Sequence, residues 1–295
     1  MGNKANDDEP ERAPLISIVI LTKNAGSPFP EVLESIFSQT LIASAEVLLI
    51  DSGSTDETLE IARRFPVRIH SILPEEFNFG LTRDLGYSLA RGEILVNLSQ
   101  DVVPISPTWL EELTLPFQDP AVAAVSARCR YRDDSTGGFL WQRMGWFYFT
   151  RDMKKIRKRF GTAFSNANSA VRKKVWEENR IGEIPIAEDI LFQKKILDKG
   201  HEIRFLEKPL AYHEHGFSVS SLAKRCINEG LGFKRIGISY TILDFLLDFA
   251  SPRKYLLLVE KTVDGKIRSW SEFFFPFLRP VCVFWGNHFR KRYLK

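Results

Sequence analysis

The chain has 295 residues, enough for one large α/β domain or for a catalytic domain of about 200 residues with a smaller appendage. Apolar residues make up 44% and charged residues 26%, close to the averages of folded proteins, which excludes disordered, collagen-like and coiled-coil chains. The 41 Lys and Arg against 37 Asp and Glu leave a net charge of only +4, too small for a protein that wraps nucleic acid.

Three features bear on the location of the protein. Residues 1–14 are polar and acidic, so we expect a flexible N-terminal segment rather than a signal sequence or an anchor. The three cysteines are odd in number and widely spaced, which favours a reducing, cytoplasmic compartment. The longest apolar stretch, residues 273–289, contains two prolines and an arginine and is not expected to span a bilayer.

The first half of the chain alternates between short apolar runs and helical patterns. The runs predict strands over residues 15–21, 46–51, 67–73, 93–98 and 121–127. The patterns between them predict helices over residues 31–39, 55–65, 81–91 and 107–117. Apolar strands separated by helices are typical of a parallel sheet that is buried on both faces. We therefore expect a doubly wound, mostly parallel α/β domain over residues 15–216.

From about Gly216 onward the alternation stops. Stretches rich in leucine and aromatic residues predict helices over residues 218–230, 241–249 and 254–263. We expect residues 217–295 to form a C-terminal helical appendage that contacts an acceptor, a membrane surface or a second subunit.

Polar residues follow three of the predicted strands, where doubly wound sheets bind their ligands. They are Thr22, Asn24, Asp51, Ser54, Gln100 and Asp101. A carboxylate such as Asp51 can accept hydrogen bonds from a base or a ribose. It can equally end a strand, with Thr55 as the N-cap of the next helix.

A glycine-rich phosphate loop is excluded, because neither GxxxxGK[ST] nor a GxGxxG after a strand occurs. A divalent cation is the natural substitute, since it offsets the charge of a diphosphate. Asp101 is then the candidate oxygen ligand, and His213 and His215 lie on one side of an extended segment. A turn aspartate and a surface pair of histidines are the alternative interpretations of these residues.

Two acidic residues, Glu188 and Asp189, open a helical pattern over residues 189–199. The helix dipole favours acids at this position whether or not they do chemistry. Asn166 and Asn168 precede this pair, and a basic run over residues 151–159 lies before them. The basic run is typical of a solvated helix face, or of a surface that meets a diphosphate or anionic lipid.

With these residues in place, the chain resembles the family 2 glycosyltransferases, which adopt the GT-A fold, and among them the bacterial rhamnosyltransferases. The resemblance runs from about Leu15 to about Ser218 and rests on the segments ISIVILTKNAG, DSGSTD, FNFGLTRDLG, SQDVVP and AED. It implies that the following residues bind a nucleotide-sugar: Thr22, Asn24, Asp51, Ser54, Asn78, Gly80, Arg83, Asp84, Gln100, Asn166 and Asn168. Asp84 stands where the family more often has Asn.

The resemblance also implies a mechanism. A divalent cation, Mg²⁺ or Mn²⁺, would bridge Asp101 and the diphosphate, completed by His213 or His215. Asp189 would be the catalytic base of an inverting displacement, with Glu188 as its acidic neighbour. Lys154, Lys155 or Arg157 would assist the leaving diphosphate.

The implied reaction is transfer of L-rhamnose from dTDP-rhamnose to a hydroxyl of a glycan or lipid-linked glycan. A UDP-hexose donor, a non-catalytic nucleotide-sugar-binding protein and a sugar-phosphate nucleotidyltransferase are the alternatives. No nucleic-acid-binding motif is present. The basic and aromatic residues near the C-terminus fit peripheral contact with the inner face of a membrane, or packing against the protein or within a homo-oligomer.

Overall fold

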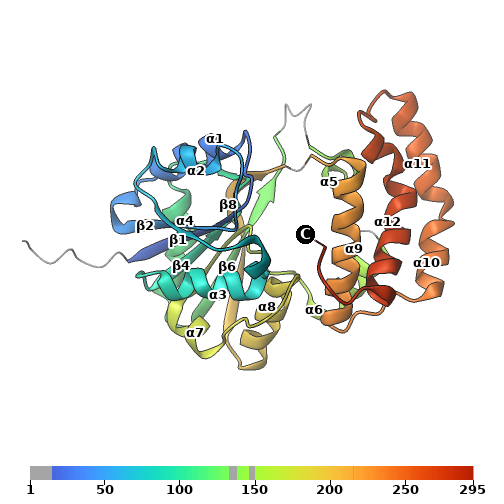
Figure 1. Ribbon diagram of the computed structural model, residues 1–295. Coiled ribbons are helices and arrows are strands. Elements are labelled where there is room, and N and C mark those ends of the chain that lie inside the picture. Colours follow the sequence, from blue (N-terminus) through green and yellow to red (C-terminus); the bar gives the residue numbers. More distant parts are fainter. Residues whose placement is uncertain (1–14, 133–137, 146–149, 215, 295) are drawn as a thin grey trace, which may run out of the picture.

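The computed structural model describes residues 15–132, 138–145, 150–214 and 216–294. The N-terminal segment over residues 1–14 lies outside these ranges. A sheet with helices on its faces lies beside a group of longer helices (Figure 1). Within the described ranges, no helix is both long and apolar enough to cross a membrane.

The sheet has eight strands in the order β3-β2-β1-β4-β7-β6-β8-β5. Their bounds are β1 (Ile16–Thr22), β2 (Ala45–Asp51), β3 (Arg68–Ser71), β4 (Ile94–Leu98), β5 (Val102–Pro104), β6 (Val122–Arg130), β7 (Asn168–Arg172) and β8 (Glu202–His213). Strands β1 to β4 are parallel neighbours, and β6 points the same way because antiparallel β7 lies between it and β4. β8 is parallel to β6, so the expectation of a mostly parallel sheet is confirmed.

Helices cover both faces of the sheet. They are α1 (Phe29–Phe37), α2 (Thr58–Ala62), α3 (Phe79–Leu89), α4 (Trp109–Thr114), α7 (Lys173–Glu178) and α8 (Glu188–Asp198). One core includes Phe29 and Trp109 on the face of α1 and α4. The other includes Tyr87, Trp176 and Phe192 on the face of α3, α7 and α8 (Figure 1). Short 3₁₀ helices cover Ile42–Ser44, Pro74–Glu76 and Leu115–Gln118.

Two local expectations need correction. Thr55 is not an N-cap: α2 begins at Thr58, whose backbone N–H donates to the Asp56 carboxylate at 3.1 Å. The apolar pattern also does not predict β5 or β7. β5 has only three residues, and β7 begins with the polar pair Asn168 and Ser169.

The remaining helices form a separate core. They are α5 (Leu140–Arg143), α6 (Arg151–Phe160), α9 (Val219–Arg235), α10 (Ile242–Phe249), α11 (Pro252–Val263) and α12 (Trp270–Phe289). Trp141 and Ile156, from α5 and α6, are buried with Leu222, Phe275 and Val283 of the C-terminal helices. The helical appendage expected over residues 217–295 is therefore joined by an earlier segment of the chain.

Helices α9 and α12 approach each other closely. A Cβ atom on Gly286 would lie 1.9 Å from the backbone oxygen of Ile227, and one on Gly230 would lie 2.2 Å from that of Val283. Glycine is thus required at both positions, because any side chain would force the two helices apart.

A buried ion cluster joins three of these helices. Arg279 of α12 is 2% exposed and donates to Asp152 of α6 at 2.7 Å and to Glu229 of α9 at 2.6 Å. Burial raises the pKa of Asp152, an effect that Arg279 opposes. The cluster therefore fixes α6 against the C-terminal helices, because each carboxylate would be costly to bury without the guanidinium.

We predict that Arg279→Met lowers the free energy of unfolding by about 3–5 kcal/mol, because it leaves Asp152 buried without its cation and leaves Glu229 with Arg225 alone. The matched control is Arg64→Met, which removes an exposed pair with Glu60 and should change stability by less than about 1 kcal/mol. Denaturant titration measures both. Equal effects of the two substitutions would contradict the assigned role of Arg279.

Candidate active site

The ends of β1 and β2 form a compact polar cradle around Asp51. Its Oδ2 accepts hydrogen bonds from the backbone N–H groups of Gly53 at 3.0 Å and Ser54 at 2.9 Å. Its Oδ1 accepts from Thr22 Oγ1 at 3.1 Å and from the Ser54 hydroxyl at 2.5 Å. Asp51 is 1% exposed, so its carboxylate mainly shapes the turn that presents the neighbouring groups.

Further hydrogen bonds tie the strand tips together. The Asn24 side-chain oxygen accepts from the Thr55 backbone N–H at 2.8 Å, and the Asn24 N–H donates to the Ser54 hydroxyl at 2.9 Å. Gln100, beyond β4, accepts from the Lys23 N–H at 2.8 Å. The carboxyl ends of β1, β2 and β4 therefore lie side by side. This agrees with the expectation that the polar residues after these strands meet at one end of the sheet.

The expected cation ligands are also brought together. β5 pairs with β8 so that Val102 lies opposite His213, and the His213 Nε2 lies 3.3 Å from the Asp101 carboxylate. His215 lies outside the described residues. Among the described residues there is no group of three or more His, Cys, Asp or Glu that could hold a metal. A carboxylate and an imidazole suit a divalent cation that takes its other ligands from a diphosphate and water.

The start of α3 holds the segment that leads to α8. Asn78 caps α3, and its side-chain oxygen accepts from the N–H groups of Leu81 at 3.2 Å and Ile184 at 3.0 Å. A Cβ atom on Gly80 would lie 2.1 Å from the Gly182 backbone oxygen, so only glycine permits this approach. Asn78 and Gly80 thus act here on the position of residues 182–184.

Asp84 has a similar anchoring position. Its carboxylate accepts hydrogen bonds from the Trp176 indole at 2.6 Å and from the N–H groups of Ile181 at 3.1 Å and Gly182 at 2.8 Å. A carboxylate suits three donors because it only accepts, whereas an Asn amide would bring two donors of its own.

Arg83 connects the sheet core to the start of α8. Its guanidinium donates to the Asn97 side chain on β4 at 2.9 Å and lies 3.5 Å from the Glu188 carboxylate. The Tyr87 hydroxyl donates to the same Asn97 oxygen at 2.5 Å, and the Asn97 amide donates to Ser169 at 3.2 Å. The sequence analysis missed Asn97 and Tyr87, because a polar residue inside an apolar strand gives no sign of its partner.

Glu188 and Asp189 form the first turn of α8. Glu188 is buried and accepts from the Asn166 amide at 3.0 Å. Ala187, just before it, has a φ of 63°, a left-handed conformation that is rare outside glycine and that clusters at functional sites. Burial, and next the Glu188 carboxylate, raise the pKa of the half-buried Asp189 to about 7. A carboxylate with this pKa is suited to accept a proton near neutral pH.

Asn168 does not join this group. Its side-chain oxygen accepts from the Trp109 indole at 3.0 Å and its amide donates to the Arg128 backbone at 3.3 Å, so it braces the sheet. Tyr293 approaches the group from the C-terminal segment. Its ring packs edge-on against Phe79 at 5.9 Å, and burial, with Glu188 nearby, raises its pKa. Only the folded chain reveals this contact.

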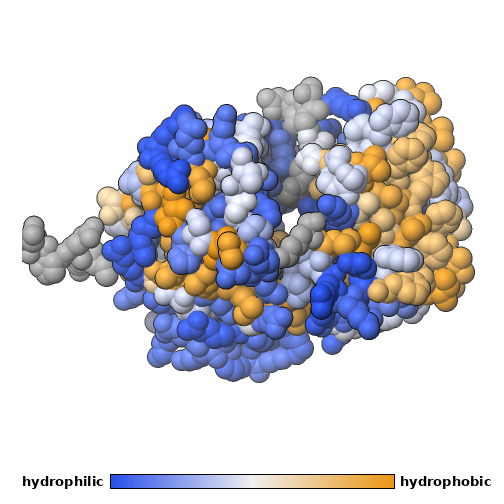
Figure 2. Space-filling model, viewed as in Figure 1, coloured by the Kyte–Doolittle hydropathy of each residue, from blue (hydrophilic) through white to orange (hydrophobic). Residues whose placement is uncertain are grey.

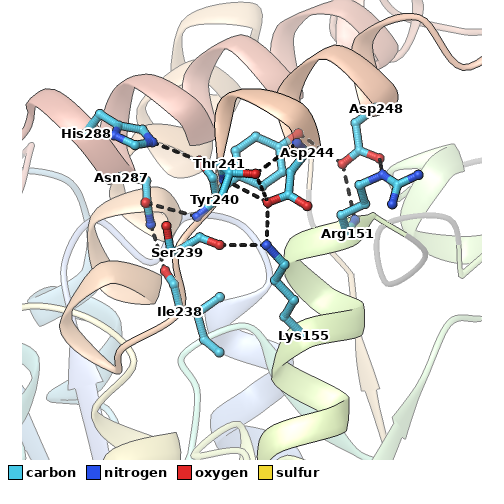
Figure 3. A network of polar contacts seen from close by, with 10 residues as sticks. All are labelled: Arg151, Lys155, Ile238, Ser239, Tyr240, Thr241, Asp244, Asp248, Asn287 and His288. Atoms are coloured by element: carbon cyan, nitrogen blue, oxygen red, sulfur yellow. Dashed lines mark hydrogen bonds and ion pairs between the residues drawn. The ribbon is translucent and has the colours of Figure 1, made fainter.

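The basic helix α6 is oriented towards the C-terminal helices. Lys155 pairs with Asp244 of α10 and donates to the Ser239 backbone oxygen at 2.8 Å (Figure 3). Lys154 lies beside residues of α10 and α11 in a cavity between the helices. The expectation that Lys155 assists a leaving diphosphate is therefore not supported by its contacts.

Comparison with known proteins identifies the family. The family model described as glycosyl transferase family 2 matches residues 17–179, more than half of the chain. The O-antigen chain rhamnosyltransferase RfbN of Salmonella typhimurium is 28% identical over 228 residues, which cover 73% of this chain and 71% of that protein.

Solved structures show the same fold. A mannosyltransferase of Pyrobaculum calidifontis, in complex with GDP-Man and Mn²⁺, aligns over 92% of this chain and 87% of its own with a TM-score of 0.59 and 18% identity. Glucosyl-3-phosphoglycerate synthase of Mycobacterium tuberculosis, solved with Mn²⁺ and UDP-glucose, aligns over 76% and 80% with a TM-score of 0.56 and 18% identity. The fold is therefore of the GT-A type. The match over the strand tips and the sheet shows that this chain belongs to glycosyl transferase family 2.

Proposed function

We propose that the protein is an inverting glycosyltransferase in which Asp189 is the general base. The observation that carries this proposal is the position of Asp189 in the first turn of α8, next to a buried Glu188 that Arg83 and Asn166 hold in place. Burial and the Glu188 carboxylate raise the pKa of Asp189, which suits it to accept a proton. In an inverting transfer, an acceptor hydroxyl attacks the anomeric carbon from one face while the nucleoside diphosphate leaves from the other. Asp189 takes the hydroxyl proton as the new bond forms.

The strand tips supply the other half of the proposed site. Thr22, Asn24 and Ser54 surround the turn that would receive the nucleotide, and Asp101 with His213 would hold the divalent cation. When bound, the cation offsets the charge that develops on the leaving diphosphate. The Gln100 side chain forms two hydrogen bonds with the Lys23 backbone, which hold the segment before Asp101 beside the end of β1.

We propose L-rhamnose, carried by dTDP, as the donor sugar, with a hydroxyl of a glycan or lipid-linked glycan as acceptor. The support is the likeness to RfbN, named an O-antigen chain rhamnosyltransferase, over most of both chains. We place the reaction in the reducing cytoplasm, because the three cysteines are odd in number and widely spaced. A UDP-hexose donor is the competing hypothesis, and the experiment below decides between them.

We predict that purified protein with Mg²⁺ or Mn²⁺ releases nucleotide from dTDP-rhamnose in a panel of nucleotide-sugars, and that EDTA abolishes release. Asp189→Asn should lower kcat by about 10²–10⁴-fold, because it removes the proton acceptor. Nucleotide release is measured by chromatography. The matched control is Asp198→Asn at the exposed end of the same helix, which should leave kcat unchanged.

Each contrary result has a definite meaning. Release from a UDP-hexose alone would overturn the rhamnose assignment but keep the mechanism. Nucleotide binding without release from any donor, with a glycan acceptor present, would favour a non-catalytic binding protein. Full activity of Asp189→Asn would exclude Asp189 as the base.

The pH dependence gives an independent test. We predict that kcat/KM rises with pH and reaches half its maximum at about pH 7, because Asp189 must be deprotonated to accept the proton. Glu188→Gln should move this rise to lower pH, since it removes the carboxylate that raises the pKa of Asp189. The substitution keeps the oxygen that accepts from Asn166. A profile that Glu188→Gln leaves unmoved would contradict the assigned coupling.

The cation site can be tested separately. We predict that Asp101→Asn raises the Mn²⁺ concentration for half-maximal activity by at least about tenfold, because one of two protein ligands is weakened. Asp119→Asn, a surface carboxylate paired with Arg204, is the matched control and should leave this concentration unchanged. An unchanged Mn²⁺ requirement in Asp101→Asn would place the cation elsewhere.

A further inference from the structure

The outer side of the C-terminal helices exposes many large apolar residues. Figure 2 shows them gathered over the end of the molecule formed by α10, α11 and α12. We define the apolar face as Ile242, Leu243, Leu246, Leu247, Leu256, Val259, Val263, Trp270, Phe274, Val281 and Trp285, whose exposed fractions run from 41% to 82%. Exposed apolar residues of the sheet part, such as Leu73 and Leu115, lie far apart in the chain on different elements. An apolar patch of this extent marks an interaction surface.

The apolar face follows the helical repeat. Leu256, Val259 and Val263 recur on one side of α11, as Trp270, Phe274 and Val281 do on α12. The opposite sides of these helices are already packed, because Leu258 of α11 and Phe275 and Val283 of α12 are buried. Helices α11 and α12 are therefore apolar on two sides. One side packs in the core of the helical part, and the other is the exposed apolar face.

The sequence left two interpretations of the aromatic residues near the C-terminus: membrane contact, or packing against the protein or within a homo-oligomer. The two sides of α12 correspond to contact at the surface and packing within the protein. Phe275 and Val283 are buried against the other helices, whereas Phe274 and Trp285 point outward. Helix α12 thus contributes both to the core and to the apolar face.

Charge distribution indicates the kind of partner. Residues 217–295 contain 14 Lys and Arg against 6 Asp and Glu, whereas the rest of the chain contains 27 against 31. The two acids of α10 are turned inward, Asp244 towards Lys155 and Asp248 towards Arg151 and Tyr240 (Figure 3). The outward side of α10 is left to Ile and Leu residues. The helical part is therefore apolar on its outer side and positively charged overall.

A basic cavity adjoins the apolar face. It has a volume of about 730 Å³ and lies between α6, α10 and α11. Four basic residues line it, against two acidic ones: Arg151, Lys154, Arg253, Lys254, Asp248 and Glu260. Leu247 and Leu256 belong both to the cavity and to the apolar face. Arg151 is paired with Asp248 and Lys254 is buried, whereas Lys154 and Arg253 are exposed. Anionic headgroups would therefore meet Lys154 and Arg253, close to the leucine side chains that would contact acyl chains.

We propose that the apolar face is a docking surface for an anionic lipid membrane. Amphipathic helices with leucine and tryptophan on one side and basic residues around them bind at the membrane interface. A second copy of the chain fits less well, because it would bring two regions of the same net charge together. This proposal goes beyond the sugar transfer proposed above and does not rest on it.

The test is flotation of the full chain with vesicles of phosphatidylcholine, with or without about 30% phosphatidylglycerol. We expect partitioning at least about tenfold stronger with the anionic lipid, and weakened by raising the salt from about 0.1 M to about 1 M. Equal partitioning to both vesicles, or none to either, would overturn the proposal. Sugar transfer is not measured, so failure here is distinct from failure of the proposed activity.

Paired variants locate the surface. Leu243→Gln/Leu256→Gln should lower partitioning to anionic vesicles at least about tenfold, because it removes two large apolar contacts that are 61% and 71% exposed. The matched control, Leu73→Gln/Leu115→Gln, changes leucines of the sheet part that are 58% and 55% exposed and should leave partitioning unchanged. Equal partitioning of the two double variants would overturn the assignment. So would a wild-type dimer, seen by light scattering, that only Leu243→Gln/Leu256→Gln dissociates.

Discussion

The candidate site depends on the burial of one carboxylate. Glu188 is 7% exposed, and a charge in that position is tolerable only when cations and hydrogen-bond donors surround it. Arg83 and Asn166 supply them, from α3 and from the segment before β7. Arg83 is in turn held by Asn97 in the middle of β4. The position of Asp189, one residue further on, is therefore fixed from the centre of the sheet rather than by its own loop.

The same constraint explains why the motif residues of α3 lie where they do. Asn78, Gly80 and Asp84 all contact the backbone of residues 181–184, which leads into α8. The polar atoms of Asn78 and Asp84 accept hydrogen bonds from this segment and from Leu81 and Trp176. These contacts set the path by which the chain enters α8.

Much of this arrangement is predictable from the sequence, for identifiable reasons. The strands around Ile18, Leu49 and Val96 are apolar throughout, and the polar tips at Asp51 and Asp101 follow them directly, so local pattern and topology agree. Asn97 and Tyr293 could not be predicted, because their partners lie far away in the sequence and neither follows a periodic pattern. The packing of α6 with the C-terminal helices could not be predicted for the same reason. In the sequence, Asp152 is a single acid within a basic run, and nothing there indicates that it is buried.

The ion cluster of Arg279 has a consequence for synthesis on the ribosome. Asp152 and Arg279 are 127 residues apart, so the carboxylate leaves the exit tunnel long before its partner is made. The family-matched residues 17–179 contain α6 but not α12, whose Arg279 pairs with Asp152. Until α12 is made, burial of the Asp152 carboxylate would lack its cation. A nascent chain of this protein can build its sheet early, but it can pair Asp152 with Arg279 only after α12 has been made.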